Sequence, residues 1–335
     1  FFVALDMSDP AEAKARLAAK HWGTASEDDI DCLLVDMVTM EAVEDVQMEL
    51  FTALYQSSKS GGRTRQRLTE SDSLRVAANS LVEYGGDEKL VRMIFKFVWD
   101  QCTEEPGRES WGRHNGPVLT CEAMRRHMTS PPVLVQGLGV LRALGTSDEL
   151  KRQGWVAEHG CPLIVDCLRE FGEAELDVAA QGLAATWNMC LIDENQRLFF
   201  DQGITGLVLS AMKSHPADPN VQRWGCGSIR ALGVPKEHKE ALVALGAVEQ
   251  VMASHGAIPH DSGILCEVLA SLWNMSTEEA NRGFVAENGA LELCELGIER
   301  AKIPGAPGEL TRCANGLKKL LPKEELGNLL TKPAR

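Results

Sequence analysis

Apolar residues recur with the spacing of amphipathic helices along most of the chain, and the pattern repeats every 43 residues. A glycine marks the same point of each clear unit, at Gly160, Gly203, Gly246 and Gly289. Apolar residues stand four positions before each glycine and five positions after it, namely Val156, Phe199, Leu242 and Val285, then Val165, Val208, Val251 and Cys294. This constant phase predicts an array of structural units that pack against one another.

Each unit is predicted to contain three helices. The glycine falls between two short amphipathic patterns, where a sharp turn from one helix into the next favours a left-handed residue. A longer apolar helix then follows, for example at residues 178–190 and 264–276. The sequence therefore predicts an all-α chain of about six to seven three-helix repeats.

The repeats are predicted to fill a single domain, residues 1–335. Stepping back by about one period continues the phase to Gly116 and, more weakly, to Ser73. We expect divergent repeats at residues 1–115, clear repeats at 116–321, with a final third helix at 310–321, and a C-terminal tail at 322–335. Segments rich in turn-forming residues are predicted as connections, at residues 104–116, 214–219 and 304–308.

Two segments carry a resemblance to a known family. Residues 281–290 (NRGFVAENGA) and 272–276 (LWNMS) resemble the armadillo repeat family, whose units read NRxxIVExGGIPxLVxLL followed by a helix that ends near WxLxNLS. The likeness runs from about Ser73 to Leu321 and is strongest over residues 133–296. It implies a right-handed superhelical α-α solenoid in which the third helices line a concave groove.

The resemblance also implies groove residues. In armadillo proteins that hold an extended peptide, an asparagine near the end of each third helix bonds the peptide backbone, because a primary amide both donates and accepts. Counting fifteen residues back from each glycine places Gln101, Gly145, Asn188, Ala231 and Asn274 in that column. Gln101, Asn188 and Asn274 are therefore candidate binding residues, although the two asparagines would equally serve to tie helix ends together.

The tryptophans separate this chain from the nuclear-import adaptors of the family. Those adaptors place a tryptophan four residues before the asparagine that bonds the peptide backbone, and these tryptophans pack against the aliphatic part of lysine side chains. Ala184 and Ala270 occupy that position in this chain. The resemblance therefore does not support a nuclear-import role. Trp187 and Trp273, which directly precede the asparagines, are expected to pack in the core, where large aromatic side chains contribute most.

Two further kinds of residue have two interpretations each. Arg142 and Arg230 begin matching ArgAlaLeuGly stretches and are candidate groove residues, or else belong to a solvated helix face. Trp22, Trp99 and Trp111 lie outside the well-aligned units and fit either partner contacts or the capping of an exposed end. Capping is favoured for Trp99, because it lies on an apolar helix.

The charge of the chain bears on its partners. The net charge is −14, from 48 acidic and 34 basic residues, so the chain lacks the basic footprint that binding to nucleic acid requires. The acidic surface favours basic partner segments, or it serves only solubility. The sequence contains no apolar run of about 18 residues, so we predict no direct membrane span.

The ten cysteines are spread one to a helical segment without a CxxC motif. This usage is typical of small buried side chains in an intracellular, reducing compartment. The cytoplasm is the preferred location, and an organelle stays open because the chain begins with Phe1 and Phe2 rather than methionine, which indicates processing or truncation.

No constellation of catalytic residues is evident. The eight histidines are dispersed, and no cysteine or histidine group has the spacing of a metal site. Gly225-Cys226-Gly227 lies in a helical repeat rather than after a strand, so it is not a phosphate loop. We therefore predict no enzymatic activity, no cofactor, no metal and no small-molecule substrate.

The sequence leaves two functional hypotheses. The first is a non-enzymatic protein-protein interaction scaffold that serves as a structural or adaptor subunit of a larger intracellular assembly and uses broad surfaces or the connections at residues 104–116 and 304–308. The alternative is a peptide-binding adaptor that grips an extended basic segment in its concave groove. The incomplete asparagine column favours the first.

Overall fold

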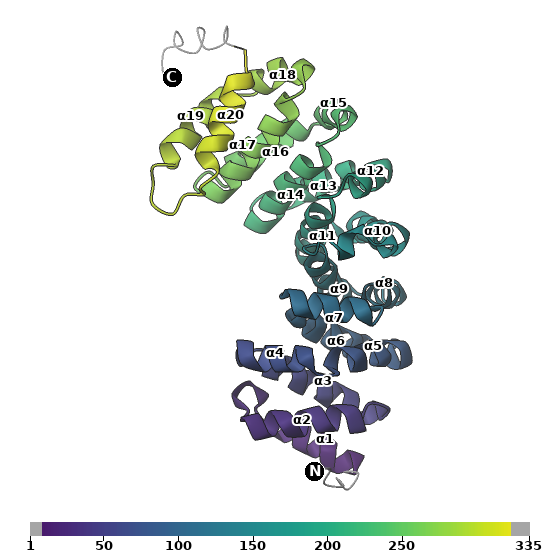
Figure 1. Ribbon diagram of the computed structural model, residues 1–335. Helices are drawn as coiled ribbons and strands as arrows, with labels where there is room; N and C mark the ends of the chain where they lie inside the picture. The colour runs from purple at the N-terminus through teal and green to yellow at the C-terminus, as the bar shows by residue number, and fades with distance from the viewer. Residues whose placement is uncertain (1–8, 323–335) are drawn as a thin grey trace. The chain divides into compact units, whose positions relative to one another are not determined.

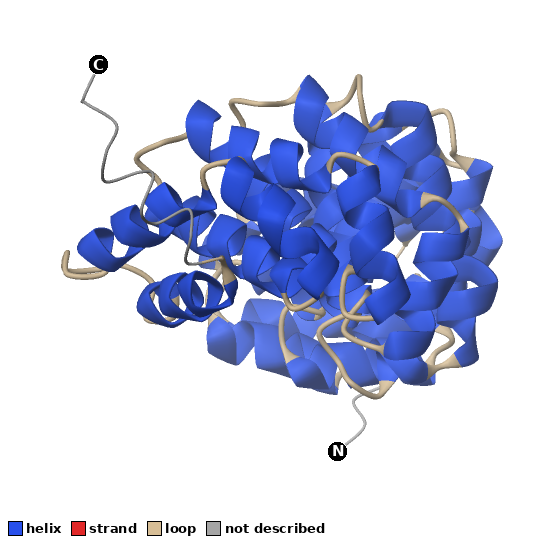
Figure 2. Ribbon diagram, turned by 90° about the horizontal axis from the view of Figure 1, so that it is seen from above, coloured by secondary structure: helices blue, strands red, loops and turns tan. Residues whose placement is uncertain are grey.

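The structure is a computed structural model that describes residues 9–322 of the chain. Over these residues the chain forms helices joined by turns, and none of them lies in a strand (Figure 2). The predicted all-α class is therefore confirmed. Of the predicted C-terminal tail, residues 323–335 lie outside the described residues.

The chain divides into two compact units, Phe1–Leu163 and Ile164–Arg335, and the division falls within helix α10 (Cys161–Phe171). The described part of the first unit contains three successive sets of three α-helices (Figure 1). These sets are α1 (Pro10–Ala19), α2 (Glu27–Thr39) and α3 (Glu44–Ser58); α4 (Gly62–Glu70), α5 (Ser73–Tyr84) and α6 (Glu88–Gln101); and α7 (Glu105–Arg113), α8 (Gly116–Arg126) and α9 (Pro131–Leu144).

The next set departs from the regular plan. Its first helix is replaced by a 3-10 turn, η2 (Leu150–Arg152), and a π-helical turn, η3 (Val156–Gly160), before α10 and α11 (Leu176–Met189). The remaining sets of the second unit are α12 (Asp193–Asp201), α13 (Ile204–Ser214) and α14 (Pro219–Leu232); α15 (Lys236–Ala244), α16 (Ala247–Ala257) and α17 (Ser262–Ser276); and α18 (Arg282–Glu287), α19 (Ala290–Arg300) and α20 (Leu310–Leu320).

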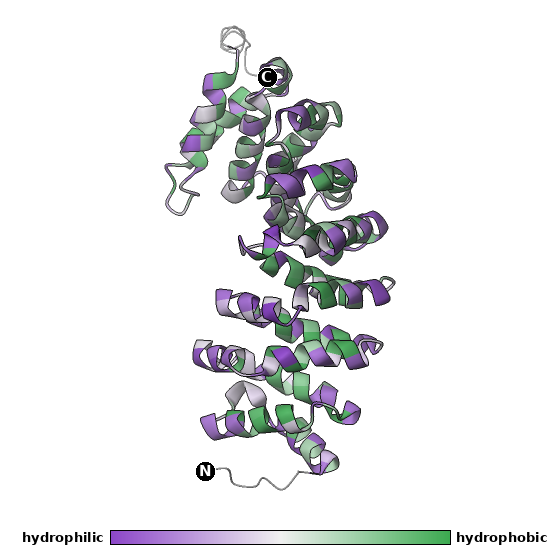
Figure 3. Ribbon diagram, turned by 45° about the vertical axis from the view of Figure 1, so that its right-hand side comes forward, coloured by the Kyte–Doolittle hydropathy of each residue, from purple (hydrophilic) through white to green (hydrophobic). Residues whose placement is uncertain are grey.

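The third helices of successive sets pack side by side within each unit. In the first unit α3 packs on α6 and α6 on α9, and in the second α11 packs on α14, α14 on α17 and α17 on α20 (Figure 1). Fully buried apolar side chains fill the spaces between helices, such as Phe51 and Phe97, whose ring centroids are 6.2 Å apart. Figure 3 shows the hydrophobic residues gathered where helices face one another. The third helices thus form a continuous row in each unit.

Left-handed glycines begin the second helices of three sets, as the repeat pattern predicts. Gly203, Gly246 and Gly289 have φ angles of 75°, 88° and 87° and directly precede α13, α16 and α19. The prediction is wrong at Gly160, because the π-helical turn that it ends continues into α10 without a left-handed residue. The predicted phase is also displaced at Gly116, since the left-handed residue before α8 is Asn115, with φ 57°.

Gly246→Ala is expected to lower the free energy of unfolding by about 1–2 kcal/mol, because an L side chain in the left-handed region meets its own backbone. The surroundings add little, since the nearest atom to an added Cβ is Glu249 Oε2 at 3.9 Å. Gly206→Ala in α13 is the matched control: no atom lies within 4 Å of its added Cβ, and alanine should raise stability by about 0.5–1 kcal/mol. Urea denaturation followed by circular dichroism measures both, and changes of the same sign would contradict this assignment.

A helix replaces most of one predicted connection. Residues 104–116 contain α7, because Pro106 in its first turn has a backbone geometry suited to a helix start. Arg108 pairs with Glu105 one turn before it and supports the same turn. The other two predicted connections are confirmed, between α13 and α14 and between α19 and α20.

Trp22 and Trp111 belong to the core of the first unit, where they are 2% and 0% exposed. Trp22 Nε1 donates to the Leu17 carbonyl at 2.9 Å, and Trp111 Nε1 donates to Thr120 Oγ1 at 3.2 Å. Both indoles are buried with their N–H group satisfied, which is the arrangement of a packing residue. Of the two interpretations that the sequence left open, partner contact does not fit these side chains.

Candidate functional site

The third helices carry matching side chains at their twelfth position. The residues there are Trp99 of α6, Arg142 of α9, Trp187 of α11, Arg230 of α14 and Trp273 of α17. The thirteenth position holds Asp100, Ala143, Asn188, Ala231 and Asn274. A tryptophan with a polar neighbour therefore alternates with an arginine followed by alanine, and the surface chemistry of these helices repeats every two sets.

Each of these tryptophan rings lies against a glycine of the following third helix. An added Cβ atom would lie 2.5 Å from the ring for Gly139 and Trp99, 2.6 Å for Gly227 and Trp187, and 2.5 Å for Gly316 and Trp273. Because such a contact is impossible for a real Cβ, glycine is what lets the ring rest on the helix backbone. The rings are half-buried, so the prediction that Trp187 and Trp273 turn into the core is wrong.

A pocket of about 360 Å³ lies between two of these tryptophans in the second unit. Its walls come from α11, α14, α17 and α20 and their ends, and include Trp187, Leu191, Arg230, Val234, Trp273, Asn274 and Arg312. The guanidinium carbon of Arg230 lies 5.5 Å from the ring centroid of Trp187, and that of Arg312 lies 5.7 Å from the ring centroid of Trp273. Each aromatic ring of this pocket therefore already carries a cation from the protein itself.

Ion pairs hold the two arginines of this pocket from the side. Arg230 Nη2 lies 3.3 Å from Glu267 Oε2, without the geometry of a hydrogen bond, and Arg312 Nη2 lies 2.8 Å from Glu309 Oε2. Burial raises the pKa of the Glu267 carboxyl, and the nearby Arg230 opposes that rise. Neither glutamate lines the pocket, so the guanidinium groups are the charges that a ligand would meet there.

Asn274 joins two third helices. Its Nδ2 donates to the carbonyl of Arg230 at 2.7 Å, which links α17 to α14. This contact fits the interpretation that the asparagine ties helix ends together, yet the side chain also lines the pocket. Asn188 occupies the same position of α11 and is likewise half-buried. A role for either in binding a partner backbone stays a prediction.

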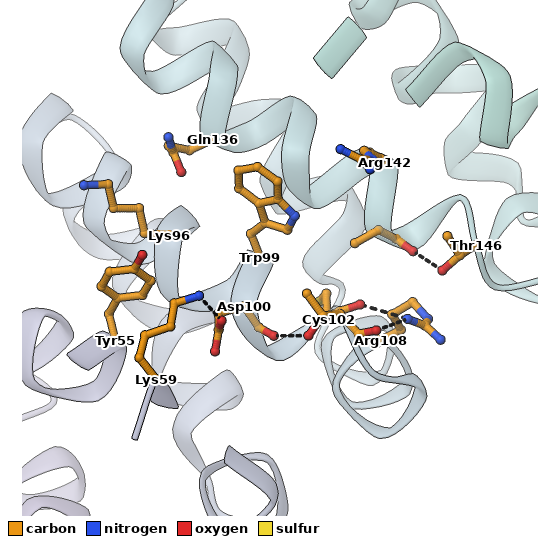
Figure 4. Close-up of a pocket in the computed structure, with 12 residues that line it drawn as sticks. Tyr55, Lys59, Lys96, Trp99, Asp100, Cys102, Arg108, Gln136, Arg142 and Thr146 are labelled. Carbon is orange, nitrogen blue, oxygen red and sulfur yellow. Dashed lines mark hydrogen bonds and ion pairs between the residues drawn. The ribbon is translucent and has the colours of Figure 1, made fainter. Parts of the chain in front are cut away.

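A larger pocket of about 630 Å³ lies in the first unit, between α3, α6, α7 and α9. Figure 4 shows Trp99 in its middle, with Lys96 and Gln136 on one side and Arg142 on the other. Trp99 does not cap an end of the array, because its ring rests on Gly139 and lines this pocket. Burial lowers the pKa of Arg142, although arginine stays protonated in proteins.

Asp100 organises the base of this pocket. The carboxylate is 4% exposed, and it accepts hydrogen bonds from Lys59 Nζ and, at 3.1 Å, from Arg65 Nε (Figure 4 shows the first). Lys59 Nζ also lies 5.2 Å from the ring centroid of Tyr55. The only acidic side chain that lines the pocket is thus already paired with two cations.

The similarity of this chain to known proteins lies in its fold. No protein-family model matches the chain, and no curated protein does. A designed armadillo repeat protein matches it with a TM-score of 0.62 at 16% identity, over 72% of this chain and 99% of that one. Computationally designed armadillo repeat proteins for modular peptide recognition match with a TM-score of 0.61 at 12% identity, over 74% of this chain and 100% of the other. The chain has the armadillo-repeat fold.

A natural protein gives the same result. A chain from a structure that concerns a phosphorylation switch in the interaction between cadherin and beta-catenin matches with a TM-score of 0.71 at 11% identity. The match covers 92% of this chain and 60% of that one. The resemblance drawn from residues 272–290 is therefore confirmed at the level of the fold. The row of third helices in each unit is that of an armadillo-type helical solenoid.

In the second set of helices, the residue that corresponds to the peptide-binding asparagine of armadillo proteins is Asp100 and not Gln101. Gln101 is 0% exposed and points inward, where its Oε1 accepts from Thr69 Oγ1 at 2.6 Å. The sequence count is displaced by one because the left-handed residue of that repeat is Asn115 rather than Gly116. The structure therefore brings Arg142 to the first pocket and Arg230 and Asn274 to the second, and it leaves Gln101 in the core.

Several of the buried cysteines are held in the neutral thiol form. Burial raises the pKa of the Cys121, Cys226 and Cys294 thiols to about 12, which disfavours the thiolate that a nucleophile or metal ligand needs. Over residues 9–322, no group of three or more His, Cys, Asp or Glu side chains is arranged to hold a metal ion. In the same part of the chain, the helices are too short or too polar to cross a membrane.

Proposed function

We propose that this armadillo-fold protein is a non-enzymatic protein-binding scaffold whose rows of third helices hold extended segments of partner proteins. The observation that carries the proposal is the set of three half-buried tryptophans, each seated on a glycine beside a pocket. Tryptophan and arginine are the residues most enriched at the energetic centres of protein interfaces. The fold neighbours designed for modular peptide recognition support the same use of this face.

The pocket sizes also support a ligand made of side chains. Cavities of about 360 and 630 Å³ fall near the range in which proteins enclose ligand groups, and both combine aromatic faces with a few polar groups. Because each pocket lies on a row of packed third helices, the groups around it are held by rigid elements. Such a surface loses little conformational entropy when a segment binds.

A second candidate function is that of a structural subunit whose outer surfaces are covered by other chains. Exposed apolar side chains away from the pockets favour it, notably Val82, Leu245 and Ile303, which are 61%, 53% and 58% exposed. Single exposed apolar residues are common on soluble proteins, however, and these three do not surround a pocket. They therefore serve best as the comparison surface in a binding experiment.

Affinity capture from a native lysate tests the proposal with two matched variants. Trp187→Ala with Trp273→Ala should reduce the retained partner protein at least about tenfold, because it removes the aromatic walls of the second pocket. Leu245→Ser with Ile303→Ser alters two exposed residues outside the pockets and should retain the wild-type amount. Equal retention by the tryptophan variant, together with loss in the control, would support the structural-subunit function instead.

A further inference from the structure

We infer that the pocket of the second unit binds an acidic protein segment anchored by an aliphatic side chain, an inference that rests on the proposed function. The charge of the whole chain, −14, predicts a basic ligand, but the charged side chains that line this pocket are basic, and their glutamate partners, Glu267 and Glu309, lie outside its lining. Its charged lining residues are Arg230 and Arg312, and no acidic side chain lines it. Opposite charge between a surface and its ligand steers association and disfavours wrong partners.

The aromatic faces exclude a ligand cation. In a pocket that binds basic segments, the aliphatic part and the ammonium group of a ligand lysine pack against the open face of a tryptophan. Here Arg230 and Arg312 already lie over Trp187 and Trp273, at 5.5 and 5.7 Å from the ring centroids. A lysine that entered would therefore meet a guanidinium group of like charge, whereas a carboxylate would meet two groups that bind it through paired hydrogen bonds.

Both arginines keep hydrogen-bonding capacity for a ligand. A guanidinium group has five N–H donors, and the ion pair of Arg230 with Glu267 occupies none of them, because it lacks the geometry of a hydrogen bond. The pair of Arg312 and Glu309 is open to water, with side chains 63% and 60% exposed, so it contributes little to stability and is readily replaced. A ligand carboxylate can thus take the place of water or of Glu309 beside the tryptophan rings.

The rim of the pocket supplies the aliphatic anchor site. Leu191 and Val234 are 57% and 52% exposed, and both line the pocket next to Trp187 and Trp273. An aliphatic ligand side chain between them would bury apolar surface of all four residues, and removal of that surface from water favours binding. Asn274 stands beside this site with one N–H committed to the Arg230 carbonyl, and its amide has a second N–H and an oxygen for a segment's backbone.

The pocket of the first unit has the same chemistry. Its lining includes four basic side chains and a single acid, Asp100, which is paired with Lys59 and Arg65. Trp99 and Arg142 occupy the helix positions that Trp187 and Arg230 occupy in the second unit. In both units, therefore, a pocket combines basic side chains with tryptophan, although the protein as a whole is acidic. A long phosphate backbone would still be repelled by the rest of the surface, so a short protein segment fits better than nucleic acid.

Fluorescence anisotropy with four labelled peptides of equal length tests the inference. The peptides repeat Glu-Glu-Leu, Gln-Gln-Leu, Lys-Lys-Leu and Glu-Glu-Ser. The Glu-Glu-Leu peptide should bind the full chain at least about tenfold more tightly than each of the others. Arg230→Gln with Arg312→Gln should remove most of this preference, whereas Arg197→Gln with Arg169→Gln, an equal change of charge in the same unit outside the pocket, should keep it. Leu191→Ser with Val234→Ser should weaken only the leucine peptides.

Each other outcome overturns the inference in a different way. Tighter binding of the Lys-Lys-Leu peptide, lost in the tryptophan variant, would refute the acidic ligand and leave the proposed function intact. Equal loss in the two arginine variants would show a general charge effect rather than a site. An oligothymidylate that bound as tightly and responded to the same variants would indicate a phosphate ligand. No binding of the Glu-Glu-Leu peptide at millimolar concentration, with native partner capture still dependent on Trp187 and Trp273, would refute only the inference.

Discussion

Trp111→Ala is expected to lower the free energy of unfolding by about 3–5 kcal/mol, the range for removal of a large aromatic side chain from a packed core. The residue is 0% exposed and joins α7 to α8. Its ring packs directly on the backbone of Gly116, where an added Cβ would come within 2.2 Å of it, and glycine has no side chain to fill the vacated space. The substitution also leaves Thr120 Oγ1 without the indole N–H.

Urea denaturation followed by far-ultraviolet circular dichroism measures this loss. Trp273→Ala is the matched control, because that ring is half-buried and rests on a helix surface. We expect the control to lose less than half as much stability while it weakens partner binding, and Trp111→Ala in its folded state to bind normally. A loss below about 1 kcal/mol for Trp111→Ala would show that the site collapses around the missing ring.

Gly227→Ala should lower the free energy of unfolding by about 1–3 kcal/mol, although alanine normally favours a helix. The added Cβ would lie 2.6 Å from the Trp187 ring, so the indole must leave its place on α14. That movement also disturbs Trp224, whose ring centroid lies 5.6 Å from that of Trp187, and the stacked Arg230. The cost is therefore one of overpacking at a single close contact.

A double-mutant cycle isolates this contact. In the Trp187→Ala background the ring is absent, and Gly227→Ala should instead raise stability by about 0.5–1 kcal/mol, because alanine restricts the unfolded chain and suits a helix interior. The change of sign between the two backgrounds is the expected result. If Gly227→Ala had the same effect in both, the proximity of Trp187 would not be what requires glycine there.

The repeat itself was visible in the sequence, because a glycine in the left-handed region and apolar residues at a fixed phase leave a regular trace. The regularity ends where local geometry changes. At Gly160 the chain passes through a π-helical turn instead of reversing, and in the preceding repeat Asn115 takes the left-handed position. Asparagine tolerates that conformation, so the residue type gave no signal, and the neighbouring Gly116 misled the count.

The candidate site could be predicted only in part for the same reason. Arg142, Arg230 and Asn274 were found because they belong to recurring short stretches, and the structure places each beside a pocket. The prediction of Gln101 was wrong by one position. On a helix, such a shift replaces the residue that lines the pocket, Asp100, with one whose side chain is buried. The surface positions of Trp187 and Trp273 depend on glycines 40 and 43 residues further along, Gly227 and Gly316, and helix periodicity alone does not reveal such pairs.

The contact between each tryptophan ring and a glycine also restricts the order in which the sets can follow one another. The ninth residue of a third helix is Gly139 in α9 and Gly227 in α14, but Ala184 in α11 and Ala270 in α17. If the set that ends with α14 were deleted, Ala270 would take the place of Gly227 beneath Trp187, and its Cβ would collide with the ring. Gene duplication, or an engineer who changes the length of this unit, can therefore preserve the packing only if each tryptophan-bearing third helix is still followed by one that presents glycine to the ring.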